Sequence, residues 1–239
     1  NIISEKEYSA TNEVINENSS MTYNTGNVLN TYNEEKILYD AKGNMIYGPL
    51  NGVYVNYEYD CRNRLIKVGN TEYVYDAENN RIAVIENGVR TDYVINPENS
   101  LSQILIKRDS KGNEVYYIYG NGLIGEEANG SYLAYHFDSR GSTVTITGIS
   151  GKIVSRFAYD IYGKLRWSWG SKKTPFMYNG RDGVVTDNNG LIYMRARYYN
   201  IELKRFINQD IVVGDIQDNR SLNRYAYVYG DPVNKIDPL

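Results

Sequence analysis

Aromatic and polar positions alternate at several places along the chain, each time just before an aspartate. The stretches YEYD, YVYD, YHFD and FAYD pair Tyr57 with Tyr59, Tyr73 with Tyr75, Tyr135 with Phe137, and Phe157 with Tyr159. Side chains two positions apart in a strand point to the same face, so each pair predicts a strand with one aromatic face. Short β-branched runs such as LIKV, IAVI and TVTIT follow, and they predict the next strand.

The aspartates open a repeated motif, D-x-x-(G or N). It begins at Asp40, Asp60, Asp76, Asp109, Asp138, Asp160 and Asp187. Aspartate at the first position of a type I turn accepts backbone N–H groups, and Gly or Asn at the fourth position tolerates a left-handed backbone. Each motif therefore predicts a hairpin tip, and we interpret the first six aspartates as turn caps. None of the seven has the alternating acidic positions and terminal Glu of an EF-hand calcium loop.

The spacing of the motifs bears on the architecture. Successive aspartates are 16 to 33 residues apart, which is too irregular for a strict solenoid. We expect an all-β fold, an irregular array of antiparallel β-hairpins that forms a curved or spiralling strip. With about seven hairpins, a closed shell is beyond the chain's 239 residues, so we expect the strip to be open.

Composition narrows the function classes. The chain has 25 Tyr against 4 Phe, which indicates amphipathic sheet faces because each phenol hydroxyl needs a partner or water. The net charge is −3 with both signs mixed, so nothing predicts a nucleic-acid partner. No apolar run reaches the roughly 18 residues of a membrane helix. One Cys and one His exclude an internal disulfide and a His/Cys metal cluster, and no cofactor is predicted.

The C-terminal third carries more specific motifs. The stretch PFMYNGRDGVVTDNNGLIYMRARYYNIELKRFINQD spans 175–210, and NRYAYVYGDPVNKIDPL spans 223–239. Together with the YD turns, these ordered motifs resemble YD-repeat, or RHS-repeat, proteins and their RHS-associated core. We accordingly divide the chain into a polar N-terminal segment or degraded repeat (1–34), a hairpin array (35–174) and a core or plug segment (175–239).

The resemblance implies a function. Such proteins wind hairpins into a hollow shell that the core segment plugs, and bacterial toxins of this type hold a C-terminal payload inside. They cut the chain just after a D-P-x-G motif with a built-in aspartyl protease. The residues that match are Asp210 and Asp237, with Arg197 beside them, and Arg195 and Arg205 are rivals for the arginine. Two carboxylates that share a proton can hydrolyse a peptide bond, here as an intramolecular reaction of the full-length protein.

Several residues depart from the family pattern. Ile211 stands where a Pro follows the first aspartate, and Lys204 stands where a Gly precedes the RF pair. The connection between the two aspartates is also long, and Asp215, Asp218 and Asp231 compete for the assignment. The final Gly of the motif is not in the sequence. These departures leave open a scaffold with a degenerate dyad, in which both aspartates are turn residues.

A second class of function is a non-enzymatic, cell-surface adhesion module that binds carbohydrate or protein. Trp167 and Trp169 alternate in WSW and so share a strand face, which suits stacking on a sugar, although we favour aromatics packed in the core or against the plug. For the toxin interpretation, the expected partners are the payload and a further shell or delivery protein. The expected location is secreted or cell-surface in a bacterium.

Overall fold

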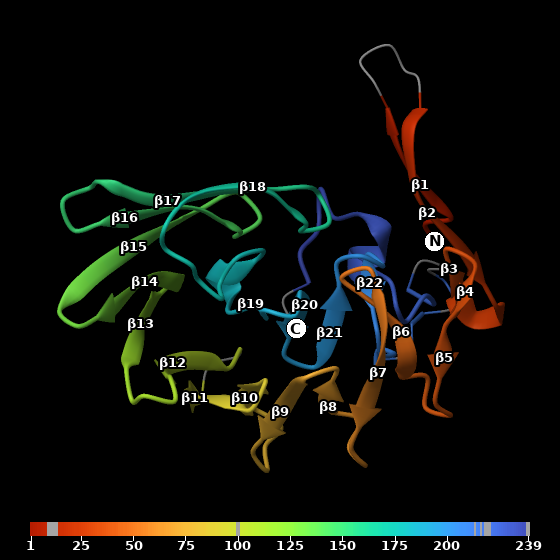
Figure 1. The fold of residues 1–239 in the computed structure, drawn as a ribbon, viewed down its shortest axis with the longest axis horizontal. Helices are drawn as coiled ribbons and strands as arrows, with labels where there is room; N and C mark the ends of the chain where they lie inside the picture. The colour runs from red at the N-terminus through yellow and green to blue at the C-terminus, as the bar shows by residue number, and fades with distance from the viewer. Residues whose placement is uncertain (9–13, 99–100, 213, 216, 218–220, 238–239) are drawn as a thin grey trace.

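The computed structural model describes residues 1–8, 14–98, 101–212, 214–215, 217 and 221–237. Half of the residues lie in strands, all paired antiparallel, and a 14-stranded sheet runs from β5 to β18. This sheet follows an open arc, and the strands β19 to β22 lie within the arc (Figure 1). The predicted curved strip with an enclosed C-terminal segment is therefore confirmed.

The strands of the described residues form three sheets. The first holds β1 (Ser4–Tyr8), β2 (Val14–Tyr23), β3 (Leu29–Tyr32) and β4 (Glu35–Lys36). The long sheet holds β5 (Leu38–Tyr39), β6 (Met45–Leu50), β7 (Val53–Tyr59), β8 (Leu65–Val68), β9 (Thr71–Tyr75), β10 (Arg81–Glu86), β11 (Val89–Asn96), β12 (Gln103–Arg108), β13 (Glu114–Gly120), β14 (Gly122–Ala128), β15 (Ser131–Phe137), β16 (Thr143–Gly148), β17 (Ile153–Tyr159) and β18 (Leu165–Gly170).

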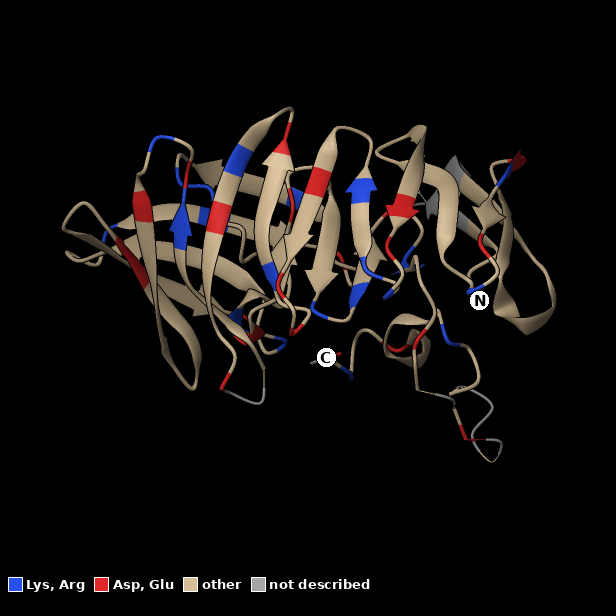
Figure 2. Ribbon diagram, turned by 90° about the horizontal axis from the view of Figure 1, so that it is seen from below, with Lys and Arg blue, Asp and Glu red and all other residues tan. Residues whose placement is uncertain are grey.

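The inner sheet holds β19 (Val185–Thr186), β20 (Leu191–Met194), β21 (Arg197–Asn200) and β22 (Arg205–Phe206). Three short 3-10 turns complete the described secondary structure: η1 (Thr25–Asn27), η2 (Gly180–Asp182) and η3 (Tyr227–Gly230). Acidic and basic positions are interspersed along the strip (Figure 2). Among the described residues, no helix is long and apolar enough to cross a membrane.

All seven D-x-x-(G or N) motifs form hairpin tips. In each, the backbone N–H of the fourth residue donates to the carbonyl of the aspartate, at 2.9 to 3.4 Å. The fourth residue always has a positive φ, between 63° at Asn63 and 92° at Gly163. The first six carboxylates accept backbone N–H groups of their own turns, as Asp160 does from Tyr162 and Lys164, both at 2.9 Å. The turn-cap interpretation is therefore confirmed for these six.

Side chains on the tips also link one hairpin to the next. The residue two places after one aspartate donates to the carbonyl of the residue just after the following aspartate. Lys42 donates to Cys61 at 3.2 Å, and Arg62 to Ala77 at 2.8 Å. Arg140 repeats this pattern with Ile161 at 3.2 Å. These bonds link the first tip to the second, the second to the third, and the fifth to the sixth.

The paired aromatics share one face of each strand, as predicted, and this face points to the interior. Tyr57, Tyr73, Tyr135 and Phe157 are buried, and the second ring of each pair packs partly buried against the same core. Most of these tyrosines hydrogen-bond their hydroxyls: Tyr57 donates to the Pro49 carbonyl at 2.9 Å, and Tyr159 to the Thr143 carbonyl at 2.9 Å. The Tyr59 hydroxyl is the exception, since it is buried without a hydrogen-bond partner. The bonded hydroxyls explain the preference for Tyr over Phe, because a phenol can reach the backbone of a neighbouring strand.

The seventh motif aspartate behaves differently. Asp187 is buried, and its carboxylate accepts two hydrogen bonds from Arg81, at 2.7 and 2.9 Å. The Arg81 guanidinium lies 4.1 Å from the centroid of the Tyr193 ring. This buried pair joins β10 of the strip to the turn before β20, and it fixes the inner sheet against the arc.

The tryptophans correct one expectation. We expected core or plug packing, but Trp167 and Trp169 are 51% and 55% exposed. They lie on β18, at one end of the long sheet, opposite Ala158 and Arg156 of β17. The alternating residue Phe157 is buried, so the two indoles share the outer face, away from the inner sheet. The shared face that alternation predicted is confirmed, and the separate expectation of core or plug packing is wrong.

Candidate aspartate site

Arg197, the first residue of β21, joins the two predicted aspartates. Its Nη1 lies 2.8 Å from Asp210 Oδ2, and its Nη2 donates to Asp237 Oδ2 at 2.9 Å. The side chains of Asp210 and Asp237 are 30% and 14% exposed, whereas Arg197 is buried. All three residues that the sequence singled out therefore meet at one point.

The environment of Arg197 explains why the guanidinium stays there. Burial lowers the pKa of Arg197, and the negative charges of Asp237 and Asp210 oppose that shift. The guanidinium carbon lies 3.6 Å from the centroid of the Phe206 ring, so one flat face is covered and the in-plane N–H groups remain for the carboxylates. A guanidinium, rather than a shared proton, links the two acids in this arrangement.

Asp210 is held through its backbone. Its N–H donates to the Arg224 carbonyl at 2.9 Å, and Arg224 Nε donates back to the Asp210 carbonyl at 2.8 Å. Asp210 Oδ1 also accepts the Val212 N–H at 2.9 Å. Only Oδ2 is therefore directed to Arg197. The sequence did not predict the contact of Arg224 with Asp210, because the NRYAY stretch indicated only a family motif.

The strip supports this segment from the other side. The Met45 N–H donates to the Ile207 carbonyl at 2.8 Å, and the Tyr225 hydroxyl donates to the Gly43 carbonyl at 2.8 Å. A Cβ on Gly43 would lie 2.6 Å from the Gln209 side chain, so this tip needs glycine for close approach as well as for its φ of 80°. The first hairpin tip is thus a support for the site.

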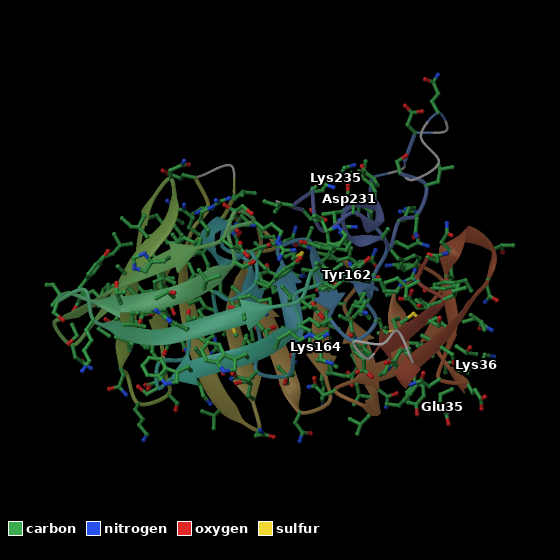
Figure 3. All side chains as sticks on the ribbon, turned by 90° about the horizontal axis from the view of Figure 1, so that it is seen from above. Glu35, Lys36, Tyr162, Lys164, Asp231 and Lys235 are labelled. Carbon is green, nitrogen blue, oxygen red and sulfur yellow. The ribbon has the colours of Figure 1, made fainter. Side chains whose placement is uncertain are left out.

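Asp237 follows a left-handed turn. Val228 and Tyr229, in η3, have φ of 45° and 57°, which is an unusual conformation for a β-branched residue and adjoins the site. Lys235 lies 4.6 Å from the Tyr229 ring centroid. Arg140 donates to the Pro232 carbonyl at 3.2 Å. Figure 3 shows Asp231 and Lys235 together on this segment, near Tyr162.

The rival residues have other partners. Arg195 donates through Nη2 to the Asp182 carbonyl, and Arg205 donates to the Asn27 carbonyl at 2.6 Å. Asp215 accepts the Gln217 N–H, and Asp231 accepts that of Asn234, as turn aspartates do. Asp218 lies outside the described residues. Of the arginines considered, Arg197 is the one placed on both Asp210 and Asp237.

Two cavities adjoin Arg197 and Asp210. One, of about 500 Å³, is also lined by Asp237 and by aliphatic residues. The other, of about 290 Å³, lies under the hairpin tips and is rich in cationic side chains. The described residues contain no group of three or more His, Cys, Asp or Glu placed to hold a metal ion. The charged groups that meet at the site are two carboxylates and a guanidinium.

Comparison with known proteins places the chain among larger molecules. No family model matches it. It is 30% identical over 206 residues to the tRNA nuclease WapA of Bacillus subtilis strain 168, and 29% identical over 206 residues to the tRNA3(Ser)-specific nuclease WapA of Bacillus spizizenii. Each match covers 84% of this chain and 7% of the relative, so the chain spans about one-fourteenth of the length of these curated relatives.

Solved structures share the fold at lower identity. A Photorhabdus luminescens Tc holotoxin pore with a TccC3 mutation matches with a TM-score of 0.62 and 17% identity, over 92% of this chain and 13% of that one. A TcdB2–TccC3–Cdc42 crystal structure matches with a TM-score of 0.58 and 15% identity, over 98% and 17%. Together, the comparisons relate this chain, at low identity, to RHS-repeat proteins of the toxin-related type.

Proposed function

We propose that this chain is the shell and plug portion of a bacterial RHS-repeat toxin, which encapsulates a C-terminal payload and cleaves itself just after the D-P-x-G motif. The observation that carries the proposal is the contact of Arg197 with both Asp210 and Asp237. Asp210 and Asp237 follow Arg197 by 13 and 40 positions in the sequence, and both contact its buried guanidinium. An aspartate that only caps a turn would not need this contact.

The chemistry assigned to the pair is hydrolysis of a peptide bond. One carboxylate takes a proton from water while the water oxygen forms a bond to the carbonyl carbon. The other, protonated, gives its proton to the leaving nitrogen as the C–N bond breaks. Arg197 offers N–H groups to the negative charge that develops on the carbonyl oxygen. Because one acid must be protonated, its contact with Arg197 opens before the reaction.

The test uses the chain extended past Leu239 by a Gly, which completes the D-P-x-G motif, and by a reporter domain. Intact mass should show two products for the parent and a single uncut chain for Asp237→Asn. Asp231→Asn is the matched control, because Asp231 lies nearby on the same segment and caps a turn with Asn234. A cut at the same bond in the Asp237→Asn chain would contradict the assignment of Asp237 as a catalytic carboxylate.

The remaining roles follow from the same proposal. The payload is the expected partner of the concave side, and a further shell or delivery protein would complete the enclosure, since the relatives are far longer than this chain. We propose export from a bacterium, with a secreted or cell-surface location. Proteinase accessibility of the tagged protein in intact cells tests that location.

A second candidate is an adhesion module, and the exposure of Trp167 and Trp169 on the outer face favours it. Large exposed aromatics mark interaction surfaces. A glycan array probed with the parent and with the Trp167→Ala, Trp169→Ala double variant tests it. Binding that the double variant loses, combined with an uncut extended chain, would favour adhesion over the toxin.

A further inference from the structure

The two cavities beside the aspartate site share one wall. Both are lined by Ala196, Arg197, Asp210, Ile211 and Arg224. Asp237 lines only the larger one. A polypeptide that passes over the aspartates can therefore place one side of its scissile bond in each cavity, and the two cavities differ sharply in character.

The larger cavity is aliphatic. Beyond the three site residues, its walls include four aliphatic side chains, Ile211, Val212, Val228 and Ile236, and two basic ones, Arg224 and Lys235. Ile211 and Val212 are 85% and 69% exposed, which is costly for adjacent aliphatic side chains unless something covers them. The volume of about 500 Å³ is enough for several aliphatic side chains of a bound peptide.

The smaller cavity is cationic. Its described lining contains six basic side chains, Lys42, Arg62, Arg64, Arg195, Arg197 and Arg224, and a single carboxylate, Asp210. Arg64 is neutralised by Asp60 at 2.7 Å. In contrast, Lys42, Arg62 and Arg224 donate to backbone carbonyls, which bind their N–H groups but leave a net positive charge.

We propose that these cavities select the substrate segment: aliphatic residues on the N-terminal side of the scissile bond and acidic residues on its C-terminal side. This inference rests on the proposed self-cleavage. The direction follows from Asp237, which lines the aliphatic cavity but not the cationic one and lies on the N-terminal side of the proposed scissile bond. The complementary charge of the cationic cavity then favours glutamate or aspartate over lysine after the bond.

Binding of labelled peptides to the Asp237→Asn chain tests the selection without any cleavage. One probe carries leucines followed by glutamates, a second has lysines in place of the glutamates, and a third has serines in place of the leucines. Fluorescence anisotropy should give the first probe about tenfold tighter binding than either of the others, weakening with added salt.

Reversing one charge in the cationic cavity tests whether this cavity causes the preference for acidic residues. Arg62→Glu should weaken the glutamate probe about tenfold and strengthen the lysine probe. Arg90→Glu, on the exposed β11 strand, should change neither. Equal binding of the three probes, or equal losses from Arg62→Glu and Arg90→Glu, overturns the inference.

The two proposals fail differently. If the probes are discriminated but the extended chain is never cut, the selection stands and the cleavage proposal falls. If the extended chain is cut, and the rate does not change when acidic residues after the bond become lysines, the cleavage stands and the selection falls.

Discussion

The aspartates of the strip and those of the inner segment differ in where their partners come from. Asp40 to Asp160 in the motif series are bound by N–H groups two to four residues away. Asp187 binds an arginine 106 residues away, and Asp237 one 40 residues away. At the tips, aspartate therefore binds groups of its own turn, whereas inside it binds side chains that are distant in the sequence. The Asp187 contact with Arg81 joins the inner sheet to the strip.

Asn replacement should separate the two kinds most strongly. Asp187→Asn leaves the buried Arg81 guanidinium without its countercharge, and we expect it to lower the free energy of unfolding by about 3–5 kcal/mol. Asp160→Asn keeps an acceptor oxygen at its turn and should cost about 1 kcal/mol or less. Urea denaturation checks both, and equal losses would contradict the distinction.

Alkaline pH should destabilise the fold by ionising the buried tyrosines of the interior, and not by a change at the hairpin tips. Burial raises the pKa of Tyr93 to about 12, and it also raises those of Tyr57 and Tyr73. A phenol with a raised folded-state pKa stabilises the fold fully below its unfolded value of about 10, and this stabilisation is lost as pH rises through the folded pKa.

We therefore expect cooperative unfolding between about pH 10 and pH 12. Absorbance of tyrosinate and circular dichroism, recorded together, should change in the same transition. Ionisation of most tyrosines near pH 10 with unchanged dichroism would show that the aromatic face is not buried as described.

Lys204 offers the smallest effect, in the opposite direction. It has a φ of 55°, a left-handed conformation, at the position where the family pattern has glycine. Lys204→Gly should stabilise the chain by about 1 kcal/mol. Thermal melting checks this, and Lys164→Gly in the strip, on the strand side of a tip, is a control that should not stabilise. A loss of stability in Lys204→Gly would show that the lysine side chain matters more than its backbone.

Local chemistry explains how much the sequence could predict. The seven turns and the aromatic pairs depend on residues within one hairpin, so their residue patterns were sufficient to predict them. The sequence did not predict the ion pair of Arg81 with Asp187, because nothing near either residue specifies a contact across the arc. Trp167 and Trp169 were misplaced for a related reason: periodicity pairs side chains on a face but does not say which face the inner segment covers.

The site shows the same division. Asp210, Asp237 and Arg197 were selected because they match ordered family motifs, and physical reasoning from the residues alone left Asp215, Asp218 and Asp231 as equals. Arg224 and the left-handed Val228 were missed. Their roles depend on a backbone contact with Asp210 and on a turn conformation, and neither leaves a residue pattern in the sequence.

The most direct test of the account is the rate of self-cleavage of the extended chain when Arg197 and Asp210 are changed singly and together. If one guanidinium organises both acids, Arg197→Gln and Asp210→Asn should each slow cleavage by at least about a hundredfold, and the double variant should be no slower than the worse single one. Melting curves confirm that each variant is folded. Cleavage of a folded Arg197→Gln chain at the parent rate would contradict the account.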